Sequence, residues 1–137
     1  MCSWKLENLH YSDNPPPNYS YTQLFPNPSW CGTISELDIE FYIEGNTHAP
    51  YPPLLNLASH IIQNMHVIVE RAIIDVSLHS GYALPNLQVG WFCLRMKNHL
   101  PTYQAVCLVC LTGYESDAWV VNFDNEDMPI SREIYSW

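Results

Sequence analysis

Residues 33–45 constrain the fold of this chain more than any other segment, because apolar and acidic side chains alternate along their whole length. The apolar members are Leu37, Ile39, Phe41 and Ile43, and the polar members are Glu36, Asp38, Glu40, Tyr42 and Glu44. Successive side chains of a β-strand point to opposite faces, so this pattern predicts a half-buried strand over residues 33–44. On the exposed face, neighbouring carboxylates would stand about 7 Å apart.

A second periodic segment follows the strand. Between residues 53 and 79, apolar side chains recur at spacings of three and four, which predicts one long amphipathic helix of about 40 Å. Pro52 and Pro53 suit its first turn, since proline has no N–H to leave unpaired there. Gly81 is a suitable helix terminator, and Pro85 prevents continuation.

Three further strands are predicted at residues 87–97, 103–112 and 118–124, with a bulge at Gly90. Their connections are short, so we expect an antiparallel meander. Residues 125–137 have room for one short helix or strand. The order strand, helix, strand, strand, strand indicates an α+β fold. We expect an antiparallel sheet of about four to five strands, with one long helix packed on one face.

Residues 1–30 differ from the rest of the chain, since they combine prolines with aromatic side chains. Proline excludes long helices and central strands, whereas a disordered linker is usually poor in aromatics. We therefore expect an irregular arm that lies against the domain, with room for a short helix within residues 3–10. Because the predicted strands are apolar on both faces, the arm is our first candidate to cover the second face; a dimer or another protein is the alternative. A chain of 137 residues fits one domain, with the arm at 1–30 and the core at 31–137.

The charge of the chain narrows the classes of partner. Fourteen acidic residues stand against five Lys and Arg, for a formal net charge of -9. This balance disfavours nucleic acid and anionic membrane surfaces, and it favours either a basic protein partner or simple solubility. No run of eighteen apolar residues predicts a transmembrane helix, and the first residues do not resemble a secretory signal. With five cysteines in all, we expect a cytoplasmic protein with free thiols.

Candidate catalytic and metal-binding patterns are weak. Cys107 and Cys110 have a redox or zinc spacing, but within a strand their side chains would point to opposite faces, which favours core thiols. On the helix, His66 with Glu70 and Asp75 with His79 are ordinary surface pairs at a spacing of four. Residues 124–135 begin like a calcium loop but lack its required glycine and final glutamate. We therefore predict no metal, no cofactor and no catalytic residue.

The acidic strand face is the candidate binding site, and a second acidic patch lies around residues 117–127. The candidate partner-binding residues are Glu36, Asp38, Glu40, Tyr42, Glu44, Asp117, Asp124, Glu126 and Asp127. In size, acidity and absence of catalytic motifs, the chain resembles the cytoplasmic immunity proteins of bacterial toxin systems. The resemblance implies a non-catalytic inhibitor, monomeric or homodimeric, that neutralises a basic toxin such as a nuclease by direct binding.

Two other functions remain open from the sequence. An acidic secretion-type chaperone or adaptor would dimerise through the apolar second face. A small enzyme with a Cys- and His-dependent site would have a concave pocket lined by ionisable groups with perturbed pKa values.

Overall fold

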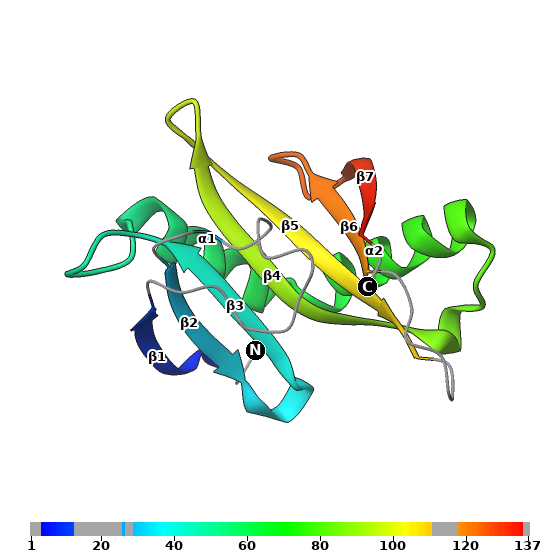
Figure 1. The fold of residues 1–137 in the computed structure, drawn as a ribbon, viewed down its shortest axis with the longest axis horizontal. Helices are drawn as coiled ribbons and strands as arrows, with labels where there is room; N and C mark the ends of the chain where they lie inside the picture. Colours follow the sequence, from blue (N-terminus) through cyan, green and yellow to red (C-terminus); the bar gives the residue numbers. More distant parts are fainter. Residues whose placement is uncertain (1–3, 13–25, 27–28, 111–117, 136–137) are drawn as a thin grey trace.

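The computed structural model describes residues 4–12, 26, 29–110 and 118–135. Within these residues, one seven-stranded sheet is covered on one face by two helices, which cross behind it in the view of Figure 1. The strands are β1 (Glu7–Ser12), β2 (Ser29–Ile34), β3 (Ile39–Glu44), β4 (Leu87–Lys97), β5 (Leu100–Val109), β6 (Ala118–Phe123) and β7 (Pro129–Tyr135). The helices are α1 (Pro52–Gln63) and α2 (Met65–Ser80), with short 3₁₀ turns η2 (Ser35–Leu37) and η3 (Leu84–Asn86).

The predicted antiparallel sheet of four to five strands is wrong in size and in type. The strands lie in the sheet in chain order, from β1 to β7, and β3 runs parallel to β4 whereas all other neighbours are antiparallel. The parallel pair follows from the helices between these strands: they carry the chain back along the sheet, so β4 starts at the same end as β3. The sheet is therefore mixed, within an α+β fold.

The two ends of the chain supply two of the additional strands, β1 and β7. β1 pairs with β2, so the expected short helix within residues 3–10 is wrong, and part of the arm is regular structure. β7 pairs with β6 and forms the other edge of the sheet. A strand was one of the two alternatives predicted for the C-terminal segment, the other being a short helix. The prediction that the arm covers the second face falls largely on residues 13–25, which lie outside the described residues.

The strand predicted over residues 33–44 is divided by a hairpin turn. η2 and Asp38, whose φ is 54°, lie between β2 and β3, and Ile34 pairs with Ile39 across the turn. The hydroxyl of Ser35 donates a hydrogen bond to Glu7 at 2.8 Å, which ties the turn to β1. The alternating pattern continued through a turn, so Glu36 and Asp38 belong to a loop rather than to a strand face.

The predicted long helix is present as two consecutive helices. Asn64 separates them with φ −113° and ψ 24°, and its side-chain amide donates to the His60 carbonyl at 2.9 Å. The apolar stripe predicted at helical spacing continues across the break, and its burial is confirmed. Its buried members are Leu54, Ala58, Ile61, Met65, Ile68, Ala72 and Val76. Gly81 ends α2 as predicted, with φ 84° and its N–H bonded to the Ser77 carbonyl at 3.0 Å.

The sheet has an apolar cluster on each face. The larger cluster joins the helices to residues such as Phe41, Phe92 and Tyr103. The smaller one, on the opposite face, consists of Tyr42, Trp91, Cys93, Val106, Ala118 and Val120. The predicted bulge at Gly90 is present as a register shift between Val89 and Trp91, so that Val89 and Phe92 both face the helices.

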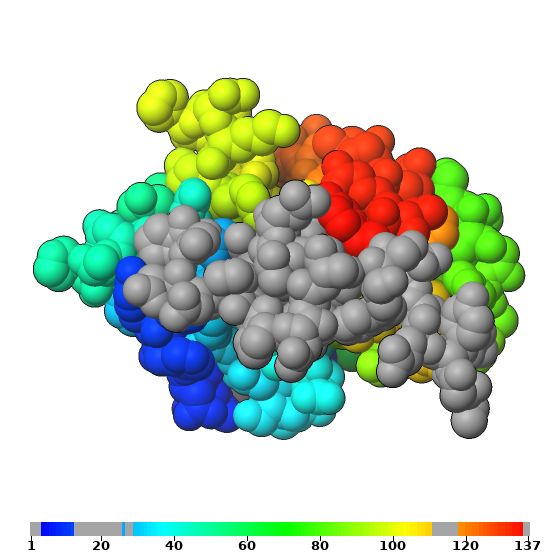
Figure 2. All heavy atoms as spheres, viewed as in Figure 1, coloured from blue at the N-terminus to red at the C-terminus, as the bar shows by residue number. Residues whose placement is uncertain are grey.

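The β4–β5 hairpin projects from the body of the sheet, as the space-filling view shows (Figure 2). Its turn is tighter than the predicted loop of residues 98–102: Lys97 pairs with Leu100, and only Asn98 and His99 lie between. Both have positive φ, 52° and 64°, as in a two-residue type I′ turn. Neither α1 nor α2 has the length and apolar character that crossing a bilayer requires.

Candidate functional site

The residues predicted to form one acidic strand face are not together. Glu36 and Asp38 are exposed in the β2–β3 turn, whereas Glu40, Tyr42 and Glu44 lie on β3. Tyr42 is only 8% exposed and belongs to the smaller apolar cluster, so its ring is not on the exposed strand face where a partner-binding residue was predicted. Its hydroxyl donates a hydrogen bond to the Glu40 carboxylate. Burial, and next this hydrogen bond, raise the pKa of Tyr42, which keeps the hydroxyl protonated as a donor.

Glu44 already has a partner within the chain. Its Oε1 atom accepts a hydrogen bond from the backbone N–H of Met96 at 2.9 Å, and the residue is half-buried. The carboxylate therefore links β3 to the C-terminal end of β4. The row of four carboxylates predicted on one strand face is reduced to Glu40 and Glu44, and only Glu40 is exposed.

The second predicted acidic patch is mostly engaged in the β6–β7 turn. Asp124 Oδ1 accepts the backbone N–H groups of Glu126 and Met128, each at 2.9 Å, which holds the turn closed. Glu126 is exposed, and Asp117 lies outside the described residues. Among the described residues of this patch, Glu126 therefore has the carboxylate most accessible to a partner.

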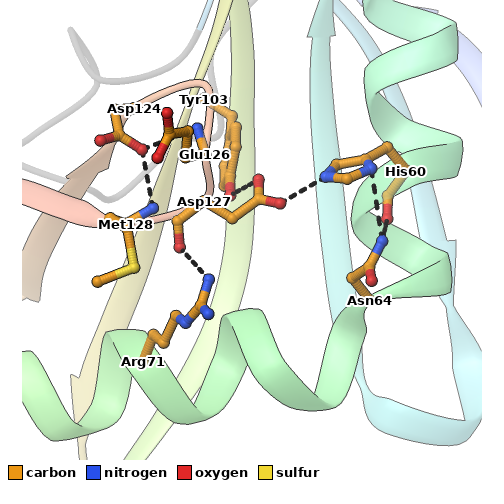
Figure 3. A network of polar contacts seen from close by, with 8 residues as sticks. All are labelled: His60, Asn64, Arg71, Tyr103, Asp124, Glu126, Asp127 and Met128. Atoms are coloured by element: carbon orange, nitrogen blue, oxygen red, sulfur yellow. Dashed lines mark hydrogen bonds and ion pairs between the residues drawn. The ribbon is translucent and has the colours of Figure 1, made fainter.

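Asp127 is the centre of a polar cluster that joins the turn to the helices (Figure 3). One carboxylate oxygen lies 2.6 Å from His60 Nε2, and the other accepts the Tyr103 hydroxyl at 2.6 Å. Arg71 donates to the Asp127 carbonyl at 2.8 Å. We call His60, Arg71, Tyr103 and Asp127 the Asp127 cluster. It draws on α1, α2, β5 and the β6–β7 turn, so distant segments meet at one carboxylate.

The Asp127 cluster connects the helices to the sheet through hydrogen bonds. His60 Nε2 faces the carboxylate and Nδ1 lies 3.4 Å from the side-chain amide of Asn64, so the contacts of the ring include neither a thiol nor a hydroxyl. Burial, and next the hydrogen bond to Asp127, raise the pKa of Tyr103 and keep its hydroxyl a donor. Among the described contacts of His60 there is therefore no side chain of the kind that a histidine activates as a nucleophile.

Two of the described cysteines, Cys93 and Cys107, are core thiols. Cys93 and Cys107 are fully buried, and burial raises the pKa of each thiol to about 12. Both thiols are protonated at neutral pH and are poor nucleophiles. Cys107 is buried and faces the helices, so the prediction of a core thiol is confirmed for it. The same prediction is wrong for Cys110, which is exposed because β5 ends at Val109, before the predicted end of the strand. The described residues hold no group of three or more His, Cys, Asp or Glu side chains placed to bind a metal ion.

A groove of about 740 Å³ lies between α2 and the ends of β3 and β4 that adjoin the turns η2 and η3. Apolar side chains line most of it, among them Val69, Ile73 and Leu84. Two exposed carboxylates, Asp38 and Glu70, are also part of its lining. We call it the α2 groove. His66 lines it too, and packs edge-on against the Trp4 ring at 5.0 Å.

The acidic residues beside the α2 groove differ from Asp75 and Asp127 in having no basic side chain paired with them in the described part of the chain. Over the described ranges, the pairs of a basic with an acidic side chain are Arg132–Asp75, His60–Asp127 and His79–Asp75, and the two histidine pairs are ionic only when the imidazole is protonated. Within those ranges, Glu36, Asp38 and Glu70 have no such partner, and the predicted surface pair of His66 with Glu70 does not form. The predicted pair of Asp75 with His79 is present at 3.7 Å, and Arg132 also bonds to Asp75 at 2.8 Å.

Sequence reasoning missed Glu70 and the groove itself. From the sequence, Glu70 was predicted only as the partner of His66 in an ordinary surface pair. Its relation to Asp38 arises because α2 passes over the ends of β3 and β4, a tertiary arrangement with no local signal. Comparison with protein-family models, with curated proteins and with solved structures finds no match for the chain.

Proposed function

We propose that this protein is a non-catalytic inhibitor that binds a basic protein and neutralises it. A toxin is the partner we expect, as in the immunity proteins that the chain resembles in size and charge. One observation supports the proposal above all: three exposed carboxylates, Glu36, Asp38 and Glu70, lie at or next to an apolar groove and have no cationic partner among the described residues.

The physical reason concerns what these carboxylates contribute to the free protein. Acids such as Asp75 and Asp127 stabilise the fold through ion pairs and hydrogen bonds. Carboxylates that repel one another without such partners contribute little to stability, but they attract a positive surface over a distance of about one Debye length. Opposite potentials speed encounter, and apolar burial then supplies affinity. An acidic surface next to an apolar groove combines both effects.

The proposed surface differs from the one expected from sequence. Its centre is the β2–β3 turn and the adjacent part of α2. Glu40 is exposed but lies on the opposite face of the sheet, since it pairs with Trp91 and accepts the Tyr42 hydroxyl, and both rings belong to the smaller apolar cluster. The patch at residues 124–127 is a weaker candidate, because Asp124 and Asp127 are hydrogen-bonded within the turn and the Asp127 cluster.

The chaperone alternative is less favoured. It needs an open apolar second face for dimerisation, but Trp91, Cys93 and Val106 on that face are each 6% exposed or less within a single chain. The enzyme alternative needs a reactive group in the groove, and no described cysteine lines it.

The test is a binding and inhibition experiment with matched charge reversals. The tagged protein is used to capture partners from the native lysate at low and at high ionic strength, and each captured protein is then assayed for activity with and without the inhibitor. Glu36→Lys with Glu70→Lys reverses two carboxylates of the proposed surface. Glu126→Lys with Glu133→Lys makes the same change in charge at exposed positions in the β6–β7 turn, which is the weaker candidate surface, and on β7. This second pair is the control for the first, and loss of binding in the second pair alone would assign the partner to the turn instead.

We expect a basic protein that is retained at low salt by the parent and by the control pair, and whose activity falls when one equivalent of the parent is added. The Glu36 and Glu70 pair should weaken its binding at least tenfold. The proposal is wrong if both pairs of variants bind the captured protein as tightly as the parent, or if the complex keeps full activity.

A further inference from the structure

The α2 groove continues as an exposed apolar surface on the outer side of the helix. Ile74, which lines the groove, is 40% exposed, and Val67 and Leu78 are 47% and 77% exposed. These three positions are spaced by seven and four residues, so they lie on one side of α2. Leu84, on the other side of the groove, is 48% exposed. Large apolar side chains gathered in this way usually mark a contact surface.

The depth of the groove suits a side chain better than a flat contact. Its floor includes Ile39, Met65 and Val89, which belong to the buried core, so an inserted group would contact the core directly. The volume of about 740 Å³ exceeds what one side chain needs and matches a short stretch of chain with one or two apolar residues. Clefts of this size typically receive partly buried anchors.

The carboxylates beside the groove favour an occupant that carries positive charge next to its apolar residues. Asp38 comes from the β2–β3 turn and Glu70 from α2, so carboxylates from two separate elements line the same groove. A second copy of this chain would bring like charge to these acids, since each copy has a formal net charge of -9. A segment that carries Lys or Arg next to its apolar residues would instead pair with them.

We infer that the α2 groove receives an apolar side chain such as leucine or phenylalanine from a Lys- and Arg-rich segment of the partner. This inference rests on the proposed function. The apolar residue fills the space beside Val69, Ile73 and Leu84, and the flanking cations approach Asp38 and Glu70. The surface that steers the partner and the groove that holds it are then one continuous site.

The test uses two synthetic peptides of equal charge and the full-length ¹⁵N-labelled protein. The first peptide is Lys-Lys-Lys-Leu-Phe-Lys-Lys-Lys, and the second replaces Leu-Phe by Ser-Ser. Binding is followed by amide chemical shifts during titration, which also detects weak complexes. Leu84→Ser with Ile74→Ser alters the groove at exposed positions, and Leu100→Ser, 65% exposed at the β4–β5 hairpin, is the matched control.

We expect the Leu-Phe peptide to bind about tenfold more tightly than the Ser-Ser peptide, and to shift amides of residues 66–74 and 84–89. Leu84→Ser with Ile74→Ser should remove this difference, and Leu100→Ser should preserve it. Asp38→Asn with Glu70→Gln should weaken both peptides. Asn tolerates the positive φ of residue 38, so the fold is kept.

Other outcomes separate the groove from the charge model. Equal binding of both peptides, or no binding of either, overturns the groove inference. If only the charged variants then alter capture of the native partner, the proposed function stands without it. If the Leu-Phe peptide binds the groove regardless of Asp38, Glu70 and salt, the groove is supported and the charge model fails. Shifts of the same amides on dilution of the protein alone would assign the groove to a second copy and overturn the inference.

Discussion

The carboxylate of Asp127 lies 2.6 Å from Nε2 of His60, although the two residues are 67 positions apart in the chain. His60 is in the last turn of α1, just before the break at Asn64, and Asp127 is in the turn between β6 and β7. The same carboxylate accepts the Tyr103 hydroxyl from β5 at 2.6 Å. The interaction therefore fixes the helix junction over the sheet, and with it the direction in which α2 runs toward the groove.

Asp127→Asn tests this connection without disturbing the backbone, since asparagine tolerates the positive φ of 60° at this position. The variant removes the charge and exchanges one acceptor oxygen for a donor, which leaves either His60 or Tyr103 poorly matched. We expect the free energy of unfolding to fall by about 1–3 kcal/mol in urea denaturation. Glu126→Gln, at the neighbouring exposed position, should change it by less than about 0.5 kcal/mol. Equal values for the two variants would show that the Asp127 cluster does not stabilise the fold.

His99→Gly is expected to stabilise the protein. The two residues of the β4–β5 turn, Asn98 and His99, both have positive φ, and Asn-Gly is the preferred pair for such a turn. Relief of the strained φ outweighs the greater freedom of glycine in the unfolded chain, for a net gain of about 0.5 kcal/mol. The measurement is the urea midpoint, with Lys97→Gly as the control in the adjacent strand position. A lower midpoint for His99→Gly than for the parent would contradict the assigned turn.

Local patterns predicted much of the central fold. The strand at residues 87–97 was predicted with its observed bounds, and the bulge at Gly90 and the end of α2 at Gly81 were predicted from the same local signals. Each depends on neighbours in sequence: alternating side chains, a residue that lacks a Cβ, or a stripe at helical spacing. These local signals do not depend on which distant segments of the chain pack against them.

The wrong predictions concern relations between distant segments. Alternation cannot distinguish one strand from a strand, a tight turn and another strand, so the turn around Asp38 was not predicted. The pairing of β1 with β2 joins Tyr11 to Trp30 across a proline-rich stretch, which carries no pairing signal. The Asp127 cluster and the α2 groove arise where helices cross the sheet. Charge alone therefore suggested a class of partner, whereas the proposed binding surface could be located only from the fold.

Gly45 and Gly90 provide a paired test of backbone packing. A Cβ at Gly45 would lie 2.5 Å from the Ala49 carbonyl oxygen and 2.7 Å from the Pro50 Cα, both backbone atoms that cannot move independently. At Gly90 it would lie 2.9 Å from the end of the Leu108 side chain, which can rotate away. We expect Gly45→Ala to cost about 2–3 kcal/mol of unfolding free energy and Gly90→Ala less than about 1 kcal/mol. Equal losses in thermal or urea unfolding would contradict this contrast.

The buried thiols should make the protein sensitive to alkaline pH. In the folded chain, burial raises the pKa of Cys93 and Cys107 to about 12, from the usual value near 9. Below about pH 9 both states hold these protons, so the contribution to stability is complete. Between about pH 9 and 12 the unfolded chain loses protons that the folded chain keeps, and the free energy of unfolding falls as pH rises.

The measurement compares urea unfolding at about pH 8 and about pH 10.5, where each thiol should account for a loss of about 2 kcal/mol. The double variant Cys93→Ala with Cys107→Ala should be less stable than the parent at the lower pH, because both side chains are packed in the core. It should, however, lose less stability between the two pH values. Part of the pH dependence will persist, since the pKa values of Tyr42 and Tyr103 are also raised. A double variant with the same pH dependence as the parent would mean that both thiols ionise equally readily in the folded and unfolded chain, in conflict with their burial.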